Sequence, residues 1–257
     1  LMETITSRTN PLMRQIRKLR DDRKARRNEG LYLCDGVKML EEAVKWNADV
    51  RTVILSEDLA DTPVPALARA VLVPADLMRS ISPMEAPQGA LFLVNTPALT
   101  PPEQLTKDRY LILDALQDPG NVGTILRTAD AFGCGGVLLT NRCADPLNPK
   151  AVRATMGAIF RTPIWEIDAA ELPALLERSG LTLAATALRD DTVSLPEADL
   201  SRSAVIIGSE GKGVSPGLLE QCAATVRIPM EPTCESLNAA AAAAVVLWEQ
   251  YRRALSC

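Results

Sequence analysis

The sequence predicts an α/β protein of two domains, the second of which is built on a mostly parallel sheet with helices on both faces. Apolar runs typical of buried strands alternate with segments of helical periodicity through the 257 residues. Repeated alternation of this kind is typical of parallel sheets, whose binding sites lie at the carboxyl ends of the strands. A proline-rich linker at 96–104 separates a small domain at 1–95 from a larger one at 105–257.

The first domain is expected to alternate helices and strands in a small three-layer arrangement. A helix is predicted over residues 11–27, with Leu12, Ile16 and Leu19 on one face and basic residues on the others. The remaining expected elements are strand 31–34, helix 37–46, and strands 51–56, 70–73 and 90–94, with helical segments between these last three strands.

Basic residues are concentrated in this N-terminal segment, although the whole chain carries a net charge of −4. Nine cations lie between Arg8 and Arg27, against the two carboxylates of Asp21 and Asp22. Such a concentration can neutralise several phosphates of a nucleic acid. The alternative is a solvated helix face without a ligand.

The second domain opens with a strand, a turn and a helix. A buried strand is predicted at 110–113, and Asp118-Pro119-Gly120 marks a tight turn. A helix follows from about Asn121, buries an apolar face and ends at Gly133. Its donor-rich start suits an anionic or polar ligand. The alternative is an ordinary βα unit in which Arg127 is a surface charge.

Two further strands lead into loops that carry polar residues. The strand at 204–207 enters the turn Gly208-Ser209-Glu210-Gly211-Lys212-Gly213, which has neither the glycine order of a dinucleotide fingerprint nor the spacing of a P-loop. A strand at 225–230 precedes Ser236-Leu237-Asn238 and an alanine-rich helix at 236–255, whose apolar residues require burial in the core or at a dimer interface. Between these segments we expect strands at 136–140 and 181–186 and a helix at 169–179.

Three motifs in this order resemble the TrmH/SpoU group of the SPOUT superfamily, which are S-adenosylmethionine-dependent RNA ribose 2′-O-methyltransferases. They are N-x-G-x-x-x-R-x-A-x-x-F-G at 121–133, G-x-E-G-x-G at 208–213, and I-P-M at 228–230 followed by S-L-N at 236–238. The resemblance implies a trefoil knot, which pattern reasoning alone does not propose because knots are rare. It also implies a homodimer. Alanines stand after Asn238 where many members have Val-Ser.

The N-terminal region is similar to the RNA substrate-binding domain that often precedes this catalytic domain and that itself resembles small ribosomal proteins. This looser resemblance is carried by Ser7-Arg8-x-Asn10-Pro11, the basic helix and Cys34-Asp35-Gly36, where the family more often has Glu-Gly in place of Asp35-Gly36. Together with a segment around Lys150 and Arg153, it implies RNA contacts by a set of cations: Arg8, Arg14, Arg17, Lys18, Lys150 and Arg153.

The resemblance also implies a site for chemistry and a site for S-adenosylmethionine. The catalytic residues would be Asn121, Arg127, Glu210, Ser236 and Asn238. The cofactor would be held by residues of the second and third motifs: Gly208, Gly211, Ile228, Met230 and Leu237. Because a guanidinium is not deprotonated in proteins, we interpret Arg127 as a group that grips phosphate and stabilises a developing alkoxide, rather than as a base.

Composition narrows the remaining possibilities. The chain has no histidine, and its six scattered cysteines form no C-x-x-C pair, so a metal site is not expected and the thiols are expected to be reduced. Neither a signal peptide nor a membrane span is recognised, which favours a cytoplasmic location. Ribosomal RNA is the favoured substrate, with transfer RNA as the other candidate. The alternatives are a non-catalytic RNA-binding protein that retains the fold and a metabolic α/β enzyme.

Overall fold

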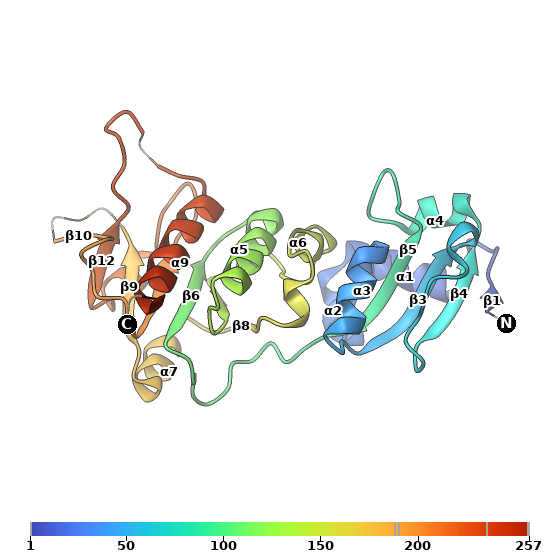
Figure 1. Ribbon diagram of the computed structural model, residues 1–257, viewed down its shortest axis with the longest axis horizontal. Coiled ribbons are helices and arrows are strands. Elements are labelled where there is room, and N and C mark those ends of the chain that lie inside the picture. Colours follow the sequence, from blue (N-terminus) through green and yellow to red (C-terminus); the bar gives the residue numbers. More distant parts are fainter. Residues whose placement is uncertain (1, 188, 190, 235, 256–257) are drawn as a thin grey trace. The chain divides into compact units, whose positions relative to one another are not determined.

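The computed structural model describes residues 2–187, 189, 191–234 and 236–255, and Figure 1 shows its elements along the chain. The chain divides into two compact units. Unit 1 comprises Leu1–Pro97 and Asp145–Arg161, and unit 2 comprises Ala98–Ala144 and Thr162–Cys257. The α/β class expected from the alternating pattern is confirmed.

Unit 1 is built on a five-stranded mixed sheet with the order β1-β4-β3-β5-β2. Parallel pairing joins β4 to both β1 and β3, whereas β5 runs antiparallel to β3 and β2. Each strand lies within about two residues of its expected position, except for β1, which was not expected: β1 Glu3–Thr4, β2 Leu31–Asp35, β3 Val50–Ser56, β4 Arg69–Val73 and β5 Ala90–Asn95.

The helix expected over 11–27 is wrong in one respect, because the chain forms two helices there. Asp22 has an extended backbone (φ −120°, ψ 116°) between α1 Pro11–Asp21 and α2 Arg23–Glu29. Its side chain accepts a hydrogen bond from the backbone N–H of Lys24 (2.7 Å) and so caps α2. The other helices of residues 1–97 are α3 Val37–Lys45, α4 Ala75–Ile81 and the 3₁₀ turn Glu57–Leu59.

The segment Asp145–Arg161 belongs to unit 1, although it lies within the part of the chain expected to form the second domain. It contains α6 Pro149–Ala154 and the 3₁₀ turn Ala158–Phe160. A buried ion pair fastens its first residue, since Arg26 Nη2 lies 2.7 Å from Asp145 Oδ2 and both side chains are almost fully enclosed. The domain boundaries drawn from the sequence stay a prediction.

Unit 2 contains a seven-stranded sheet in which every pairing is parallel, as the sequence predicts. The order β10-β12-β9-β11-β6-β7-β8 places β6 between its successor β7 and the much later β11. The strands are β6 Arg109–Asp114, β7 Val137–Thr140, β8 Ile164–Glu166, β9 Thr182–Thr186, β10 Val193–Ser194, β11 Ser203–Ile207 and β12 Ala224–Arg227.

Helices cover both faces of this sheet. The apolar side of α7 (Leu172–Ser179) packs with Ile112, Leu138 and Ile206 in one core. Alternate strand residues point to the opposite face, where α9 (Ala239–Leu255) contacts β6 and β11 and packs along α5 (Pro119–Ala131). A short helix, α8 Pro216–Leu219, follows the glycine turn. The implied trefoil knot stays a prediction.

None of the helices in the described part of the chain is both long enough and apolar enough to cross a membrane.

We predict that Arg26→Ala destabilises the protein by roughly 3–5 kcal/mol, because it leaves the Asp145 carboxylate buried with its main partner gone. Arg8→Ala is the matched control: its ion pair with Asp76 is largely exposed, so its loss should leave unfolding almost unchanged. Urea unfolding followed by circular dichroism measures both. Equal effects of the two substitutions would contradict a structural role for the buried pair.

Candidate active site

The candidate site lies at the point in unit 2 where the order of the strands changes direction. The chain leaves β6 toward β7 on one side, whereas β11 lies on the other side of β6. In an open parallel sheet, a crevice forms at such a point beyond the carboxyl ends of the strands. The loops after β6 and β11 both start at this edge, and they carry the first and second motifs.

Three of the predicted catalytic residues form one hydrogen-bonded chain. Asn121 Nδ2 donates to Glu210 Oε1, and Asn238 Nδ2 donates to Asn121 Oδ1 (3.4 Å). Asn238 Oδ1 also accepts the backbone N–H groups of Ala240 (2.9 Å) and Ala241 (3.3 Å), and therefore caps α9. The structure thus brings together residues from all three motifs.

Local structure places Asn121 at this point. The helix α5 begins at Pro119, two residues earlier than expected, because Asp118 accepts a hydrogen bond from the Gly120 N–H (2.9 Å) and caps it. Proline is favoured in the first turn of a helix because that turn leaves its N–H groups without partners in the helix. Asn121 therefore lies in the first turn of α5, beside the carboxyl end of β6.

The glycine turn is a tightly closed loop. Ser209 and Gly213 exchange two backbone hydrogen bonds, of 3.1 and 2.9 Å. Gly208 packs so closely against the returning chain that a Cβ atom there would lie 2.1 Å from the carbonyl carbon of Gly213. Glycine is required at Gly208 because any side chain would displace the backbone of this loop.

A cavity of about 350 Å³ lies between the glycine turn and the third motif. It is lined by all five of the residues predicted to bind the cofactor, together with Glu210 and Ser236: Gly208, Gly211, Ile228, Met230 and Leu237. A mostly apolar wall with a few polar groups is typical of small-molecule sites of this size. It suits S-adenosylmethionine, which combines a flat heterocycle with a polar amino-acid end.

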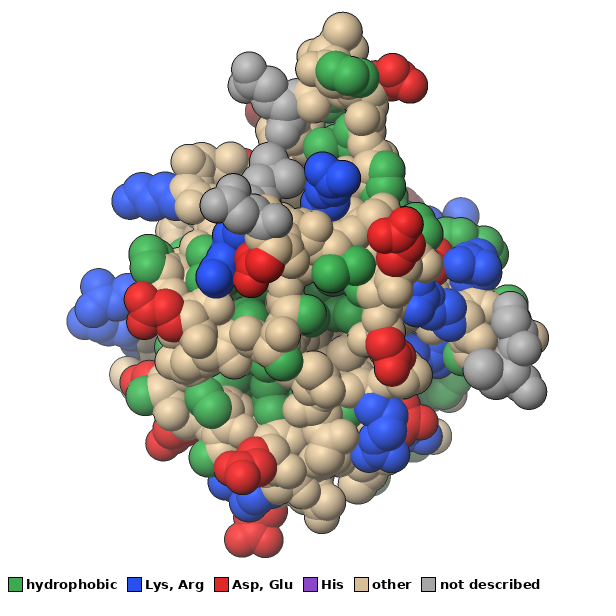
Figure 2. Space-filling model, turned by 90° about the vertical axis from the view of Figure 1, so that its left-hand side faces the viewer, with side chains coloured by type: hydrophobic (Ala, Val, Ile, Leu, Met, Phe, Trp, Pro, Cys, Tyr) green, Lys and Arg blue, Asp and Glu red, His purple; other side chains and the backbone are tan. Residues whose placement is uncertain are grey.

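Figure 2 views the molecule from the side on which β10 and β12 lie in Figure 1. Hydrophobic side chains line a hollow near the centre of this face, and acidic and basic side chains are interspersed around it. The described side chains on this side of the molecule therefore form no continuous basic surface.

Two of the predicted catalytic residues stand apart from the hydrogen-bonded chain. Ser236 is exposed and lines the cavity. Arg127 is exposed on α5, and the helical twist places it about 120° around the axis from Asn121. Within the described part of the chain, the structure gives the Arg127 guanidinium no hydrogen bond or ion pair. Its catalytic role stays a prediction.

The cations predicted to bind RNA lie in unit 1, and several also have structural partners. Arg8 pairs with Asp76 (3.1 Å), and Lys18 lies 3.7 Å from Glu29. Arg17 donates to the backbone carbonyl of Arg8 (2.9 Å). Arg14, Lys150 and Arg153 are exposed, and Arg153 also contacts the sulfur of Met84. None of these contacts tests RNA binding.

The interpretation of the basic segment needs one correction. Arg26 was counted among the cations available to phosphate, but only 2% of it is exposed and its guanidinium is engaged by Asp145. The partner lies 119 positions away in the sequence, and no local pattern indicates it.

Sequence reasoning also missed residues that hold the site in place. Thr186 lines the cavity, and Asp114 is a fully buried carboxylate at the end of β6. A charged residue directly after an apolar strand was the available signal for Asp114. No cluster of three or more metal-ligating side chains is found among the described residues.

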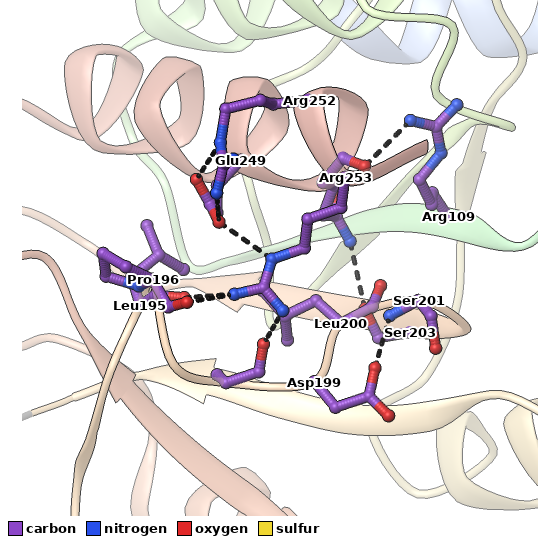
Figure 3. A network of polar contacts seen from close by, with 12 residues as sticks. Arg109, Leu195, Pro196, Asp199, Leu200, Ser201, Ser203, Glu249, Arg252 and Arg253 are labelled. Carbon is purple, nitrogen blue, oxygen red and sulfur yellow. Dashed lines mark hydrogen bonds and ion pairs between the residues drawn. The ribbon is translucent and has the colours of Figure 1, made fainter. Parts of the chain in front are cut away.

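The far end of α9 is anchored by a network around Glu249 and Arg253 (Figure 3). Arg253 donates to Glu249 Oε1 (2.8 Å) and to the backbone carbonyl groups of Leu195 (3.2 Å) and Pro196 (2.6 Å). The hydrogen bond from Arg252, followed by that from Arg253, holds the pKa of Glu249 below its usual value despite burial. These contacts tie the helix that Asn238 caps to the loop before β11.

Comparisons with known proteins agree with this geometry. The SpoU rRNA Methylase family matches residues 108–248, and the MRM3-like substrate binding domain matches residues 10–91. An uncharacterized tRNA/rRNA methyltransferase of Synechocystis is 36% identical over 97% of this chain and 94% of its own. A 23S rRNA (guanosine(2553)-2′-O)-methyltransferase of Bacillus subtilis is 30% identical over 96% of this chain and 98% of its own.

Solved structures show the same fold over nearly the whole chain. The AdoMet-bound rRNA methyltransferase of Sinorhizobium meliloti has a TM-score of 0.88 at 28% identity, and the match covers 98% of both chains. The SpoU methyltransferase AviRb of Streptomyces viridochromogenes, in complex with AdoMet, has a TM-score of 0.83 at 27% identity, covering 96% of this chain and 99% of that one.

The fold and these matches together define an RNA methyltransferase preceded by a substrate-binding domain. The chain belongs to the SpoU rRNA methylase family, which confirms the resemblance drawn from the three motifs.

We predict that Gly208→Ala weakens S-adenosylmethionine binding at least about tenfold, because the added Cβ must push the backbone at Gly213 away from its position beside the cavity. Gly217→Ala is the matched control: a Cβ there meets nothing within 4 Å and lies outside the cavity lining. Calorimetric titration measures both dissociation constants. Unchanged affinity in the folded Gly208 variant would show that the cofactor binds elsewhere.

Proposed function

We propose that this protein transfers the methyl group of S-adenosylmethionine to a ribose 2′-hydroxyl of ribosomal RNA. It is an S-adenosylmethionine-dependent RNA methyltransferase. The observation that carries the finer proposal is the hydrogen-bonded chain of Asn121, Glu210 and Asn238 beside the cavity. A protein that had kept only RNA binding would not need all of these polar residues, so we favour the enzyme over the non-catalytic alternative.

Methyl transfer from a sulfonium requires little acid–base catalysis, so the absence of histidine is compatible with it. S-adenosylmethionine, when bound, supplies an electrophilic methyl group for in-line displacement. The protein's task is then to hold the ribose hydroxyl in line with it. We assign this orientation to Ser236 and Asn238, with Glu210 fixing the amide of Asn121. The backbone around Gly208, Ile228 and Leu237 would hold the cofactor.

Arg127 is proposed to bind the phosphate next to the target ribose. Arg127 is exposed on α5 and forms no ion pair in the described part of the chain, so its guanidinium is available to bind RNA phosphate. A cation at that phosphate would stabilise negative charge developing on the hydroxyl oxygen during its attack.

We predict that Arg127→Ala lowers methyl transfer to ribosomal RNA by about 10²–10³-fold and leaves S-adenosylmethionine affinity unchanged. Arg127→Lys should recover less than about tenfold of this loss, since an ammonium group cannot make the bidentate phosphate contact. Transfer of labelled methyl to RNA, with 2′-O-methylation identified by resistance to alkaline hydrolysis, provides the measurement. Full turnover by the alanine variant would remove Arg127 from the mechanism.

The first domain is proposed to recognise structured ribosomal RNA. The match to the MRM3-like substrate binding domain supports this role for residues 1–95, joined by the linker at 96–104 to the methyltransferase domain at 105–257. The proposed RNA contacts come from exposed or partly exposed cations: Arg8, Arg14, Arg17, Lys18, Lys150 and Arg153. Transfer RNA is the other substrate class, and the cytoplasm is the proposed location for either.

A homodimer is proposed to form through the exposed side of α9. Val245 and Trp248 lie one turn apart on this helix and are 37% and 46% exposed. The ring of Trp248 contacts those of Phe132 and Tyr251, which extends the apolar area to the end of α5. An uncovered apolar stripe on a helix that also carries the site supports a second copy of this chain as its partner.

We predict that Val245→Glu converts the dimer to a monomer, because the carboxylate would be desolvated at the interface. Leu67→Glu is the matched control, since Leu67 is 99% exposed in unit 1 and its replacement should leave the mass unchanged. Sedimentation equilibrium measures both. A monomeric wild-type protein, or a dimeric Val245 variant, would contradict this interface.

A further inference from the structure

The carboxylate of Asp114 joins three segments beneath the candidate active site. Asp114 is the last residue of β6, and none of it is exposed. Its Oδ2 accepts the backbone N–H of Ser215 (2.6 Å), and its Oδ1 accepts Asn141 Nδ2 (2.6 Å). The Asn141 amide also donates to Ser215 Oγ (3.2 Å), which closes a triangle of hydrogen bonds. Ser215 follows the glycine turn, and Asn141 follows β7.

We propose that Asp114 is a positioning residue that sets the place of Glu210 relative to Asn121 during methyl transfer. This inference rests on the proposed function, because it concerns the same site. Asp114 lies outside the cavity lining and acts only through the backbone of the glycine turn.

The glycine turn transmits this restraint because it is closed on itself. The two backbone hydrogen bonds between Ser209 and Gly213 hold both ends of the turn together, and Gly208 packs against the returning chain. A loop tied in this way moves as one body, so the anchor at Ser215 limits where Glu210 can go. The chain runs from Asp114 at the end of β6 through a turn to Asn121 at the start of α5. The Asp114 carboxylate is therefore connected to Asn121 through this segment and to Glu210 through the glycine turn, and these are the two partners of one hydrogen bond.

The surroundings of Asp114 indicate that its carboxylate is needed for its hydrogen bonds and does not merely fill space in the core. A buried carboxylate is costly unless it is well hydrogen-bonded, and an apolar side chain would fill this space without that cost. The adjoining turns carry backbone strain as well, since Ala115 and Asn141 both have left-handed conformations (φ 56° and 50°). Strain of this kind persists where the surrounding contacts over-determine the backbone, and it gathers at functional sites.

The experiment uses a charge-preserving swap. Asp114→Asn removes the charge and leaves one acceptor oxygen in place of two, so the Ser215 N–H and the Asn141 amide cannot both keep their present hydrogen bonds. In the double variant Asp114→Asn with Asn141→Asp, the amide at position 114 can accept from the Ser215 N–H and donate to the carboxylate at position 141. Aspartate also tolerates the left-handed backbone of position 141.

Thr140→Val is the matched control. Thr140 lies directly opposite Asp114 in the β6–β7 register, it is buried, and its hydroxyl has no hydrogen-bond partner among the residues that the structure describes. Its replacement tests whether a change of polarity in this layer of the sheet is by itself enough to affect methyl transfer.

Single-turnover methylation at saturating S-adenosylmethionine and RNA, measured well below each variant's melting temperature, gives the first readout. We expect Asp114→Asn to slow the reaction at least about tenfold, the swap to return it to within about threefold of wild type, and Thr140→Val to change it less than about twofold. A rate close to wild type for Asp114→Asn, or no recovery in the folded swap variant, overturns the inference.

Amide hydrogen exchange gives the second readout and does not depend on turnover. Protection of the Ser215 and Gly213 N–H groups should fall in Asp114→Asn and return in the swap. If the wild-type protein methylates no ribosomal RNA while these protections behave as expected, the proposed substrate is wrong and the restraint on the loop stands. Unchanged protection in Asp114→Asn overturns the restraint itself.

Discussion

The site depends on the parallel pairing of β6 with β11. The register that sets Leu111 opposite Val205 and Leu113 opposite Ile207 ends both strands at the same edge of the sheet. The first and second motifs begin just beyond that edge, so Asn121 and Glu210 meet although 89 positions separate them in the sequence. A shift of one residue in a parallel pair turns each side chain to the other face, and the buried residues on both strands prevent such a shift.

The third motif joins this pair through the geometry of a helix start. Asn238 caps α9 with its side-chain oxygen and reaches Asn121 with its side-chain nitrogen, so one amide serves both stability and the site. The alanines that follow it let α9 lie close to its neighbours, and Ala239, Ala240 and Ala243 are buried. Helix packing and site assembly therefore rely on the same few residues.

Local patterns predicted the parallel sheet of the second unit and five of its seven strands, but not β8 or β10, and the residues that line the cavity were implied by the family resemblance. The strands β6, β7, β9 and β11 each contain an apolar run, whereas β8 and β10 have only three and two residues and give too short a pattern to recognise. The helix break at Asp22 was missed because capping by a side chain competed with a continuous helical pattern. Asp145, which pairs with Arg26, lies 119 positions from it, and Ser215, one partner of Asp114, lies 101 positions away, and such contacts exist only once the fold has formed.

The positions of Arg127 and the amide groups suggest how catalytic work is divided. Asn121 and Asn238 are held by hydrogen bonds, so under the proposed mechanism Asn238 would orient the ribose hydroxyl only within a narrow range. Arg127 lies on another side of α5, so the phosphate contact that we propose for it would leave that arrangement undisturbed. A permanently charged guanidinium contributes attraction for phosphate and for a developing alkoxide, but it takes no proton. Under the proposed mechanism, rate enhancement comes mainly from alignment and fixed charge, and it therefore requires no histidine.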